Sequence, residues 1–315
     1  MSSGARYTLR QLELFVAAAE YGSFAAAAES MFVTPNAVAL AVRDLEASLG
    51  AHLAVRQRAV GLTLTPAGVH LLQGARQLLR EADDLYWSVS DNGGPLRGPV
   101  IVGCYSTLAP TVLPPLVGGV RDAFPDVELS IVDGPVNELL TALFAGGIDA
   151  MISYDIALPA ELDQVELSRT QVHVILPESH PLAGLDVISL EDLAQEPLVL
   201  LDHPPSGDHT LRMLARVGVT PDVAYRTPNF ELVRSLVARG FGYSLLIQRP
   251  AVDVSYEGLG VISKRVVPTL SEERILISWP RAVRLTDRAR AVVDLAHTIV
   301  PTQNWFPASD GPQDG

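Results

Sequence analysis

The 315-residue sequence predicts a small helical domain with a two-stranded wing, then a long helix, then a larger two-lobed α/β domain. Three observations predict this organisation. Short helices near the N-terminus begin with hydroxyl caps. Apolar residues recur at three- and four-residue steps over residues 66–92. From residue 99 onward, buried strands alternate with helices.

Residues 1–65 are expected to form three helices and a hairpin. A capping box begins at Thr8, and Ser23 caps the second helix. Thr34, followed by Pro35 at the first helical position, opens the third helix. The stretch "LAVRQRAVGLTLT" alternates in hydropathy and turns at Gly61, as a two-stranded wing does. Together these elements predict a winged helix-turn-helix domain.

A single helix is expected over residues 66–92, followed by a linker in "DNGGPLRGP". A helix of this length with one apolar stripe must bury the stripe, and we expect a twin copy in a homodimer to cover it. The alternative is that the helix packs on its own domain. The candidate dimerisation residues are Val69, Leu72, Leu79, Ala82, Tyr86 and Val89.

Residues 93–300 are expected to form one α/β domain with mostly parallel sheets, covered by helices on both faces. The segment is too long for one small sheet, so we expect two lobes joined by crossing strands. Lobe I would hold about residues 96–167 and 266–300, and lobe II about 168–265. Residues 301–315 form a tail.

The formal net charge of −13 argues against non-specific binding to nucleic acid. The first 65 residues are less acidic than the rest, with five arginines and five carboxylates. The single cysteine, Cys104, rules out a disulfide within the chain and fits a reducing compartment. There is no signal-like N-terminus and no apolar run long enough to span a bilayer, so we expect a cytoplasmic protein.

Several segments, in their order and spacing, carry a family resemblance over nearly the whole chain. They are "LRQLELFVAAAEYGSFAAAAESMFVTPNAVALAVRDLEASLG", Leu53–Arg56, "LTLTPAG", "VILPESHPLA" and "SLVARGFGYSLL". The chain resembles the LysR-type bacterial transcriptional regulators. The resemblance implies a dimer or tetramer that binds promoter DNA through winged helices. It also implies a periplasmic-binding-protein-like C-terminal domain that responds to a small effector, with RNA polymerase as a candidate further partner.

The third helix departs from the family pattern on its outer face. Family members usually show glutamine, serine and arginine or lysine where this chain has Pro35, Ala39 and Leu40. The residues that cap or pack the helix follow the pattern. This difference leaves an alternative open, namely a ligand-sensing adapter, or a solute-binding-type protein, that no longer reads bases.

Candidate DNA contacts are drawn from the helix ends, the third helix and the wing. Helix N-termini donate N–H groups to phosphates, an asparagine can pair with adenine, and small apolar side chains can contact thymine methyl groups. Wing arginines reach the backbone or a narrow minor groove. The caps would exist without DNA, and Arg43 could belong to a solvated face. The candidates are Arg10, Ser23, Thr34, Pro35, Asn36, Ala39, Leu40, Arg43, Arg56 and Arg58.

Candidate effector contacts follow strands or begin helices, because ligands of such folds bind at those positions. A helix is expected to begin at Ser106 and Thr107. Asp155 and Asp202, at strand ends, would favour a ligand with a hydrogen-bond donor or a positive group if they are buried. Each candidate could instead be a cap or loop residue. The set is Ser106, Thr107, Tyr154, Asp155, Asp202, Thr227, Asn229, Phe230 and Tyr243.

No motif of an enzyme is present, so we expect no catalysis and no cofactor. "DHPPSGDH" places His203 and His209 near two aspartates, but the prolines and glycine indicate a loop, and no metal site is expected. His173 alternates within a strand and is expected to be structural. The expected partners are promoter DNA, an unidentified small molecule and further copies of the chain.

Overall fold

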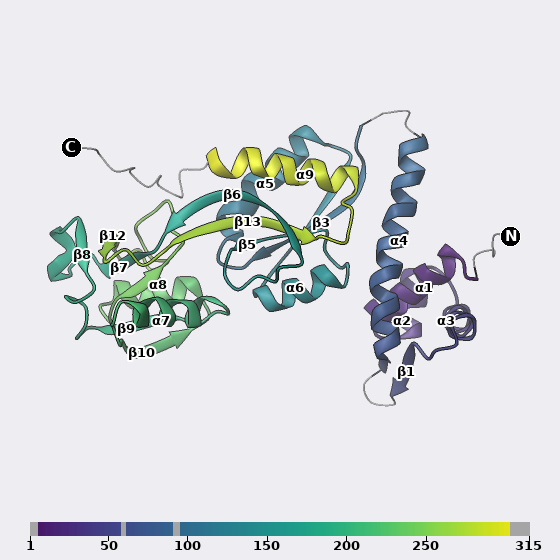
Figure 1. Cartoon of the computed structure of the whole chain (residues 1–315), viewed down its shortest axis with the longest axis horizontal. Helices are drawn as coiled ribbons and strands as arrows, with labels where there is room; N and C mark the ends of the chain where they lie inside the picture. The colour runs from purple at the N-terminus through teal and green to yellow at the C-terminus, as the bar shows by residue number, and fades with distance from the viewer. Residues whose placement is uncertain (1–5, 58–60, 91–94, 303–315) are drawn as a thin grey trace. The chain divides into compact units, whose positions relative to one another are not determined.

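The computed structural model describes residues 6–57, 61–90 and 95–302 (Figure 1). The chain divides into two compact units, which are described separately. The first comprises Met1–Leu96 with Thr141–Ile148, and the second comprises Arg97–Leu140 with Asp149–Gly315.

The first unit begins with the predicted winged helix-turn-helix. The capping box at Thr8, the Ser23 cap and the Thr34 cap are all formed, and Gly50 ends the third helix in the left-handed conformation. These outcomes confirm the predicted helix starts. The elements are α1 (Leu9–Glu20), α2 (Phe24–Ser30), α3 (Pro35–Leu49), β1 (Ala54–Gln57) and β2 (Gly61–Leu64).

One apolar core holds the three helices and the wing together. Phe15 of α1 is fully buried, and Val38 and Leu45 of α3 pack into the same core, as the helical spacing predicts. The wing strands pair antiparallel, and the Leu62 N–H donates to the Gly22 carbonyl at 2.7 Å. This bond fixes the wing to the turn before α2.

Helix α4 (Pro66–Ser90) follows the wing as one 25-residue helix. Its first turn lies close to Leu53, the residue before β1: a Cβ built on Gly68 would be 1.9 Å from the Leu53 carbonyl oxygen. Further along, Leu72 and Leu79 pack against the core formed by α1, and Ala75 is buried there. Part of the apolar stripe therefore packs on its own domain, which was the alternative to a free dimerisation stripe.

In the second unit, the first lobe is built on a five-stranded sheet in the order β4-β3-β5-β13-β6. Strand β3 is parallel to β4 and β5, whereas β13 is antiparallel to both β5 and β6. Helices α5 and α9 contact each other in this lobe (Figure 1). The elements are β3 (Gly98–Tyr105), α5 (Ala109–Ala123), β4 (Val127–Gly134), β5 (Ala150–Tyr154), β6 (Leu162–Gln171), β13 (Glu272–Pro280) and α9 (Asp287–Ile299). Helix α6 (Val136–Phe144) begins in this unit, and its residues from Thr141 onward belong to the first unit.

The second lobe has a four-stranded sheet, β11-β7-β12-β8, and a parallel pair, β10-β9. A bridge between Leu198 and Tyr243 joins the pair to the sheet. The elements are β7 (His173–Pro177), β8 (Val187–Ser189), β9 (Pro197–Leu201), α7 (Ser206–Arg216), β10 (Asp222–Thr227), α8 (Phe230–Ala238), β11 (Ser244–Leu246) and β12 (Val261–Val267), with short 3-10 turns at Pro181–Gly184 and Val300–Thr302.

The sheets are mixed rather than mostly parallel, so that expectation was wrong. The reason lies in the crossings between lobes. Strand β6 leads from the first lobe towards the second, and β13 returns beside it, so the two must run antiparallel. In the second lobe, β7 also pairs antiparallel with β11 and β12.

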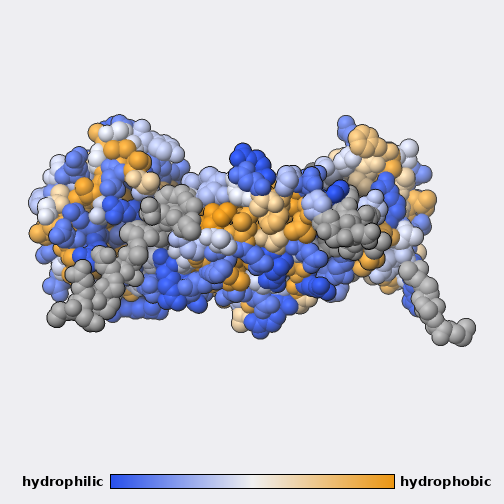
Figure 2. Space-filling model, turned by 90° about the horizontal axis from the view of Figure 1, so that it is seen from above, coloured by the Kyte–Doolittle hydropathy of each residue, from blue (hydrophilic) through white to orange (hydrophobic). Residues whose placement is uncertain are grey.

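On the face shown in Figure 2, apolar and polar residues are interspersed. Within the described ranges, no single helix is both long and apolar enough to cross a membrane. Helices α2 and α3 reach that length and composition only when taken together, and they bend by 111° at their junction.

Candidate DNA-binding surface and effector cavity

The N-terminal half of α3 presents an exposed face with little charge. Thr34, Pro35 and Asn36 are exposed at its start, and the Leu40 side chain is 49% exposed one turn later. Ala39 beside it is half-buried. The apolar side of the helix packs against the core, so these residues lie on the opposite, outer side. The face can offer backbone N–H groups, one amide and apolar contacts.

Two of the candidate residues cap their own helices. The Thr34 hydroxyl accepts from the Ala37 N–H at 3.2 Å, and the Ser23 hydroxyl accepts from the Ala26 N–H at 3.1 Å. The hydroxyls are therefore engaged within the domain. An anion at either helix start would contact other N–H groups of the first turn, which have no partner within a helix.

The candidate arginines differ in their surroundings. Arg10 forms an ion pair with Glu13 at 2.7 Å. Arg43 is exposed on α3 and forms no ion pair with the described side chains. The backbone of Arg56 pairs with Leu62 in the wing, but its side chain, like the whole of Arg58, lies outside the described residues.

An exposed aromatic residue in the helix-turn-helix turn was missed by sequence reasoning. Phe32 is 95% exposed and has a φ of 54°, in the region that residues other than glycine rarely adopt. The turn between α2 and α3 holds it there. The available signal was a large apolar residue two positions before the Thr34 cap, although such a residue more often packs in the core.

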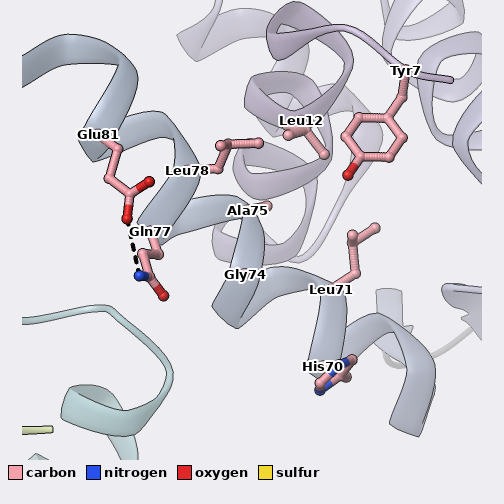
Figure 3. Close-up of a pocket in the computed structure, with 9 residues that line it drawn as sticks. All are labelled: Tyr7, Leu12, His70, Leu71, Gly74, Ala75, Gln77, Leu78 and Glu81. Carbon is pink, nitrogen blue, oxygen red and sulfur yellow. Dashed lines mark hydrogen bonds between the residues drawn. The ribbon is translucent and has the colours of Figure 1, made fainter. Parts of the chain in front are cut away.

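A groove of ≈ 310 Å³ lies between α4 and the start of α1 (Figure 3). Tyr7 and Leu12 form one side, and Leu71 and Leu78 of α4 form the other. His70, Gly74, Ala75, Gln77 and Glu81 complete the lining. The groove adds to α4 a surface of mixed polarity, with Leu71 and Leu78 as its apolar part, that the predicted stripe did not include.

The predicted dimerisation stripe is divided by the fold. Leu72 and Leu79 face the core of their own domain, and Ala82 is half-buried. Val69 and Tyr86 are exposed. The side chain of Val89 lies outside the described residues.

In the second unit, a small cavity of ≈ 20 Å³ is enclosed by residues from both lobes, about the room that one water molecule needs. Three predicted effector residues line it: Thr107, Tyr154 and Phe230. The residues that sequence reasoning missed are Leu201, Ser206, Thr210, Leu245, Leu246, Ile247 and Gln248. Gln248 follows a buried strand, and Ser206 and Thr210 lie one turn apart on α7, so the strand-end and helix-start rules could have found them.

The remaining predicted effector residues serve other contacts. The Ser106 hydroxyl lies 3.4 Å from a carboxylate oxygen of Asp133. Asn229 caps α8, and its N–H donates to the Thr227 hydroxyl at 3.2 Å. Tyr243 is buried in the core of the second lobe. None of these residues lines the cavity.

Helix α5 begins at Ala109, not at Ser106 and Thr107 as expected. The N–H of Leu108 donates to the Tyr105 carbonyl in a turn, which delays the helix. The turn leaves Thr107 buried at the cavity instead of capping α5.

The two candidate carboxylates already have cationic partners. Asp155 is hydrogen-bonded to Arg274, and Asp202 lies 3.6 Å from Arg226. Both side chains remain partly exposed. The condition on which these aspartates would favour a ligand with a hydrogen-bond donor or a positive group is therefore not met, since neither is a buried carboxylate without a partner.

Side-chain hydrogen bonds join the lobes beside the cavity. The Tyr105 hydroxyl on β3 donates to the His203 carbonyl at 3.0 Å and lies 2.8 Å from the Ser206 hydroxyl on α7. Gln248 donates through Nε2 to the Thr111 hydroxyl on α5 at 2.9 Å. Burial raises the pKa of Tyr105 to about 12. Its hydroxyl therefore remains protonated at neutral pH.

The groups considered for redox or metal chemistry are engaged or inert. Cys104 is fully buried, and burial raises the pKa of its thiol far above its usual value. His209 is hydrogen-bonded to Glu273 at 2.8 Å, and burial lowers the pKa of His203. Across the described part of the chain, no three His, Cys, Asp or Glu side chains are grouped so that they could hold a metal ion.

A winged helix-turn-helix joined to a two-lobed α/β domain with an interlobe cavity defines a ligand-responsive DNA-binding regulator. Residues 9–69 match the model of the bacterial regulatory helix-turn-helix protein, lysR family, and residues 93–299 match the LysR substrate binding domain. The chain belongs to the LysR family of transcriptional regulators. It is a DNA-binding regulator that responds to an effector.

Relatives and solved structures agree with this assignment. The chain is 30% identical to the uncharacterized HTH-type transcriptional regulator YvbU of Bacillus subtilis, covering 76% of this chain and 81% of that protein. It is 31% identical to the DNA-binding transcriptional dual regulator OxyR of Escherichia coli, covering 79% and 81%. The crystal structure of HinK, a LysR family transcriptional regulator from Pseudomonas aeruginosa, is 35% identical over 94% of this chain and 99% of that one, with a TM-score of 0.64.

Proposed function

We propose that the exposed N-terminal face of α3 contacts the bases of promoter DNA, mainly through apolar and backbone groups. The observation that carries this is the exposed, nearly uncharged face containing Asn36, Ala39 and Leu40. Leucine and alanine can contact thymine methyl groups in the major groove, and asparagine can pair with adenine. Ser23, Thr34 and Pro35 place the helix starts, and Arg10, Arg43, Arg56 and Arg58 are the proposed phosphate or groove contacts.

The low positive charge has a measurable consequence. Each neutralised phosphate releases counterions, so the dependence of affinity on salt grows with the number of cationic contacts. With five arginines balanced by five carboxylates in residues 1–65, we expect a shallow dependence. A steep dependence, as for a highly basic protein, would contradict the proposal.

The proposal is tested with an operator selected by the full chain from its own upstream DNA. Replacing thymine by uracil removes only the methyl group, so affinity should fall at the contacted positions. Leu40→Ala should weaken wild-type operator binding and lose the distinction between thymine and uracil. Leu49→Ala is the matched control, because Leu49 is 41% exposed at the other end of α3. Equal thymine and uracil binding by the wild type would overturn methyl readout.

We propose that two copies associate through α4 and the groove beside it. The outer groove walls, Tyr7, Leu71 and Leu78, together with exposed Val69 and Tyr86, would be covered by the partner. Two DNA-binding domains on one dimer raise the effective concentration of the second, which compensates for weak binding by each. Leu78→Arg should shift the full chain toward monomer in sedimentation. An unchanged dimer would contradict this interface.

We propose that the effector binds between the two lobes and acts by binding, not by being converted. A ligand that prefers one lobe arrangement shifts the population toward it, and linkage then alters DNA binding. RNA polymerase is the proposed further partner at the promoter, and the cytoplasm is the proposed location. An effector that changes neither the DNA footprint nor its bending would contradict this mechanism.

Thiol-based sensing is not part of the proposal. Several relatives are named hydrogen peroxide-inducible genes activators. This chain has one cysteine, so no disulfide can form within it. Burial keeps the Cys104 thiol protonated, and the thiolate is the reactive form.

A further inference from the structure

The cavity between the lobes contains two buried polar atoms without hydrogen-bond partners. Tyr154 and Gln248 both line it, and each residue is only 3% exposed. The Tyr154 hydroxyl and Gln248 Oε1 are buried and unpartnered among the described residues. Buried polar groups are nearly always hydrogen-bonded, and an unpaired one costs free energy. These atoms therefore indicate where a ligand would bind.

The orientation of the Gln248 amide follows from its neighbour. The Thr111 hydroxyl donates its proton to the Leu108 carbonyl at 2.9 Å. It can then only accept from Gln248, at 2.9 Å, so the amide nitrogen must face Thr111. The free atom is therefore the carbonyl oxygen Oε1, and a ligand must bring it a hydrogen-bond donor.

The Tyr154 hydroxyl presents the complementary group. Burial, with nearby Tyr105 adding to it, raises the pKa of Tyr154 well above 10, so the hydroxyl keeps its proton. It can donate that proton to an acceptor on the ligand. The Thr107 hydroxyl is its neighbour at the cavity, without forming a hydrogen bond of good geometry.

The rest of the lining carries no charge. Ser206, Thr210 and Thr107 supply hydroxyls, and the other lining residues are apolar. An anion would leave water without meeting a lysine or arginine at the cavity wall, and a cation would meet no carboxylate there. Transfer of an unpaired ion into such a site is strongly unfavourable.

We propose that this cavity binds a small uncharged molecule that donates a hydrogen bond to Gln248 Oε1 and accepts one from the Tyr154 hydroxyl. A primary amide or a small alcohol has this chemistry. Because the cavity of ≈ 20 Å³ has room for about one water molecule, such a ligand enters only when the two lobes move apart, and its apolar part would then contact Phe230 and Leu246. The proposal rests on the proposed function in taking this cavity as the effector site. It adds the chemical class of the effector.

The test uses the full chain and pairs of probes of equal shape and different charge: formamide with formate, and acetamide with acetate. We expect the amides to raise the melting temperature and the carboxylates to leave it unchanged, because a ligand that binds the native state stabilises it. Tyr154→Phe should weaken amide binding about tenfold, the value of one good hydrogen bond. Tyr256→Phe is the control, since Tyr256 is 90% exposed outside the cavity lining.

A measurement without any probe keeps the test independent of ligand choice. If the Tyr154 hydroxyl is unpaired in the protein alone, Tyr154→Phe should leave the melting temperature unchanged or raise it. A clear decrease would show that the hydroxyl already has a hydrogen-bond partner, either a protein group or a bound water molecule, and the proposal would fall. It would also fall if the carboxylates bound as well as the amides, if no probe bound, or if Tyr154→Phe bound amides like the wild type.

Operator binding in the same samples separates this inference from the proposed function. If amides bind and the operator affinity does not respond, the cavity binds neutral molecules but is not the effector site. If a charged molecule changes operator affinity and is not displaced by amides, the DNA response stands and the proposed ligand class is wrong.

Discussion

The winged helix-turn-helix and the interlobe cavity place their candidate functional residues in opposite environments. On α3, Asn36, Leu40 and Arg43 are exposed, and the helix is held from behind by a continuous core. At the cavity, Tyr154 and Gln248 are buried and lack partners. The first surface is complete without its ligand, whereas the second has hydrogen bonds left to be made. The proposed DNA contacts therefore lie on an exposed face, whereas the proposed effector contacts lie in an interior with unsatisfied hydrogen bonds.

The two regions also depend on different ranges of the sequence. Each helix of the DNA-binding domain begins at a capping residue and ends within a few residues of the stop that its own sequence indicates. The cavity is lined by residues of the turn after β3, β5, β9, α7, α8, β11 and the segment after β11, which lie far apart in the chain. Substitutions should therefore disturb the first region locally and the second through contacts between lobes.

The largest expected effect is at the junction of the wing and α4. Gly68→Ala should destabilise the first unit by about 3 kcal/mol, because the added Cβ would lie 1.9 Å from backbone oxygen of Leu53. Gly118→Ala in α5 is the matched control, with no atom within 4 Å of its Cβ, and should be neutral or stabilising. Denaturant unfolding measures both. Equal stability of the two variants would show that the backbone at Leu53 has room for a methyl group on Gly68.

A pH effect is expected in the second unit. Burial of the ring, with the Arg249 charge adding to it, lowers the pKa of His173 from 6.5 to about 4. The unfolded chain therefore binds more protons in this range, and stability should fall by up to about 3 kcal/mol as pH decreases from 6.5 to about 4. Titration of the His173 ring by NMR checks the pKa. His173→Gln should remove this part of the pH dependence of stability. If the variant kept the pH profile of the wild type, the assignment of the effect to His173 would be wrong.

The hydrogen bonds between lobes should contribute less. Tyr105→Phe leaves the His203 carbonyl and the Ser206 hydroxyl without their tyrosine partner, and should cost about 2 kcal/mol in the second unit. The first unit should be unaffected. Tyr256→Phe, at an exposed site, should change neither. If Tyr105→Phe has no effect on thermal unfolding, the lobes are not held together by this contact.

The smallest effect is expected at the cap of α3. Thr34→Ala removes the bond from the Ala37 N–H and should cost about 1 kcal/mol in the first unit. Thr34→Ser keeps a hydroxyl and should restore most of the stability. The comparison is made by denaturant unfolding monitored in the DNA-binding domain. A serine variant as unstable as the alanine variant would mean that the methyl group, not the cap, matters at this position.

The sequence predicted the DNA-binding domain closely because its signals are local. Thr34, Pro35 and Gly50 fix the ends of α3, and the spacing of Val38 and Leu45 fixes its buried side. At the cavity, the strand-end rule found Tyr154 and Thr107 but not Gln248. The difference between Asp202 and Gln248 is not visible in the sequence, because it depends on which residues the other lobe brings nearby.

The same limit applies to α4 and Phe32. The periodicity of α4 showed an apolar stripe but could not say that Leu72 and Leu79 would meet α1 of the same chain. Phe32 lies among residues that normally pack, and only the left-handed backbone of the turn leaves it exposed. The sequence shows that these residues are apolar, but only the fold shows which of them pack against a neighbour and which remain exposed.

Strands β6 and β13 carry the chain from one lobe to the other and back, and they are paired from Leu162 with Pro280 to Gln171 with Glu272. Because the two strands are hydrogen-bonded along their length, they should deform together. Sliding of one strand past the other would break hydrogen bonds, whereas bending perpendicular to the plane of the sheet would keep them. The shift of register between Ile275 and Leu276 adds a local bend to this pair of strands. In the proposed mechanism, a ligand between the lobes would therefore act on two crossing strands that are tied to each other by backbone hydrogen bonds.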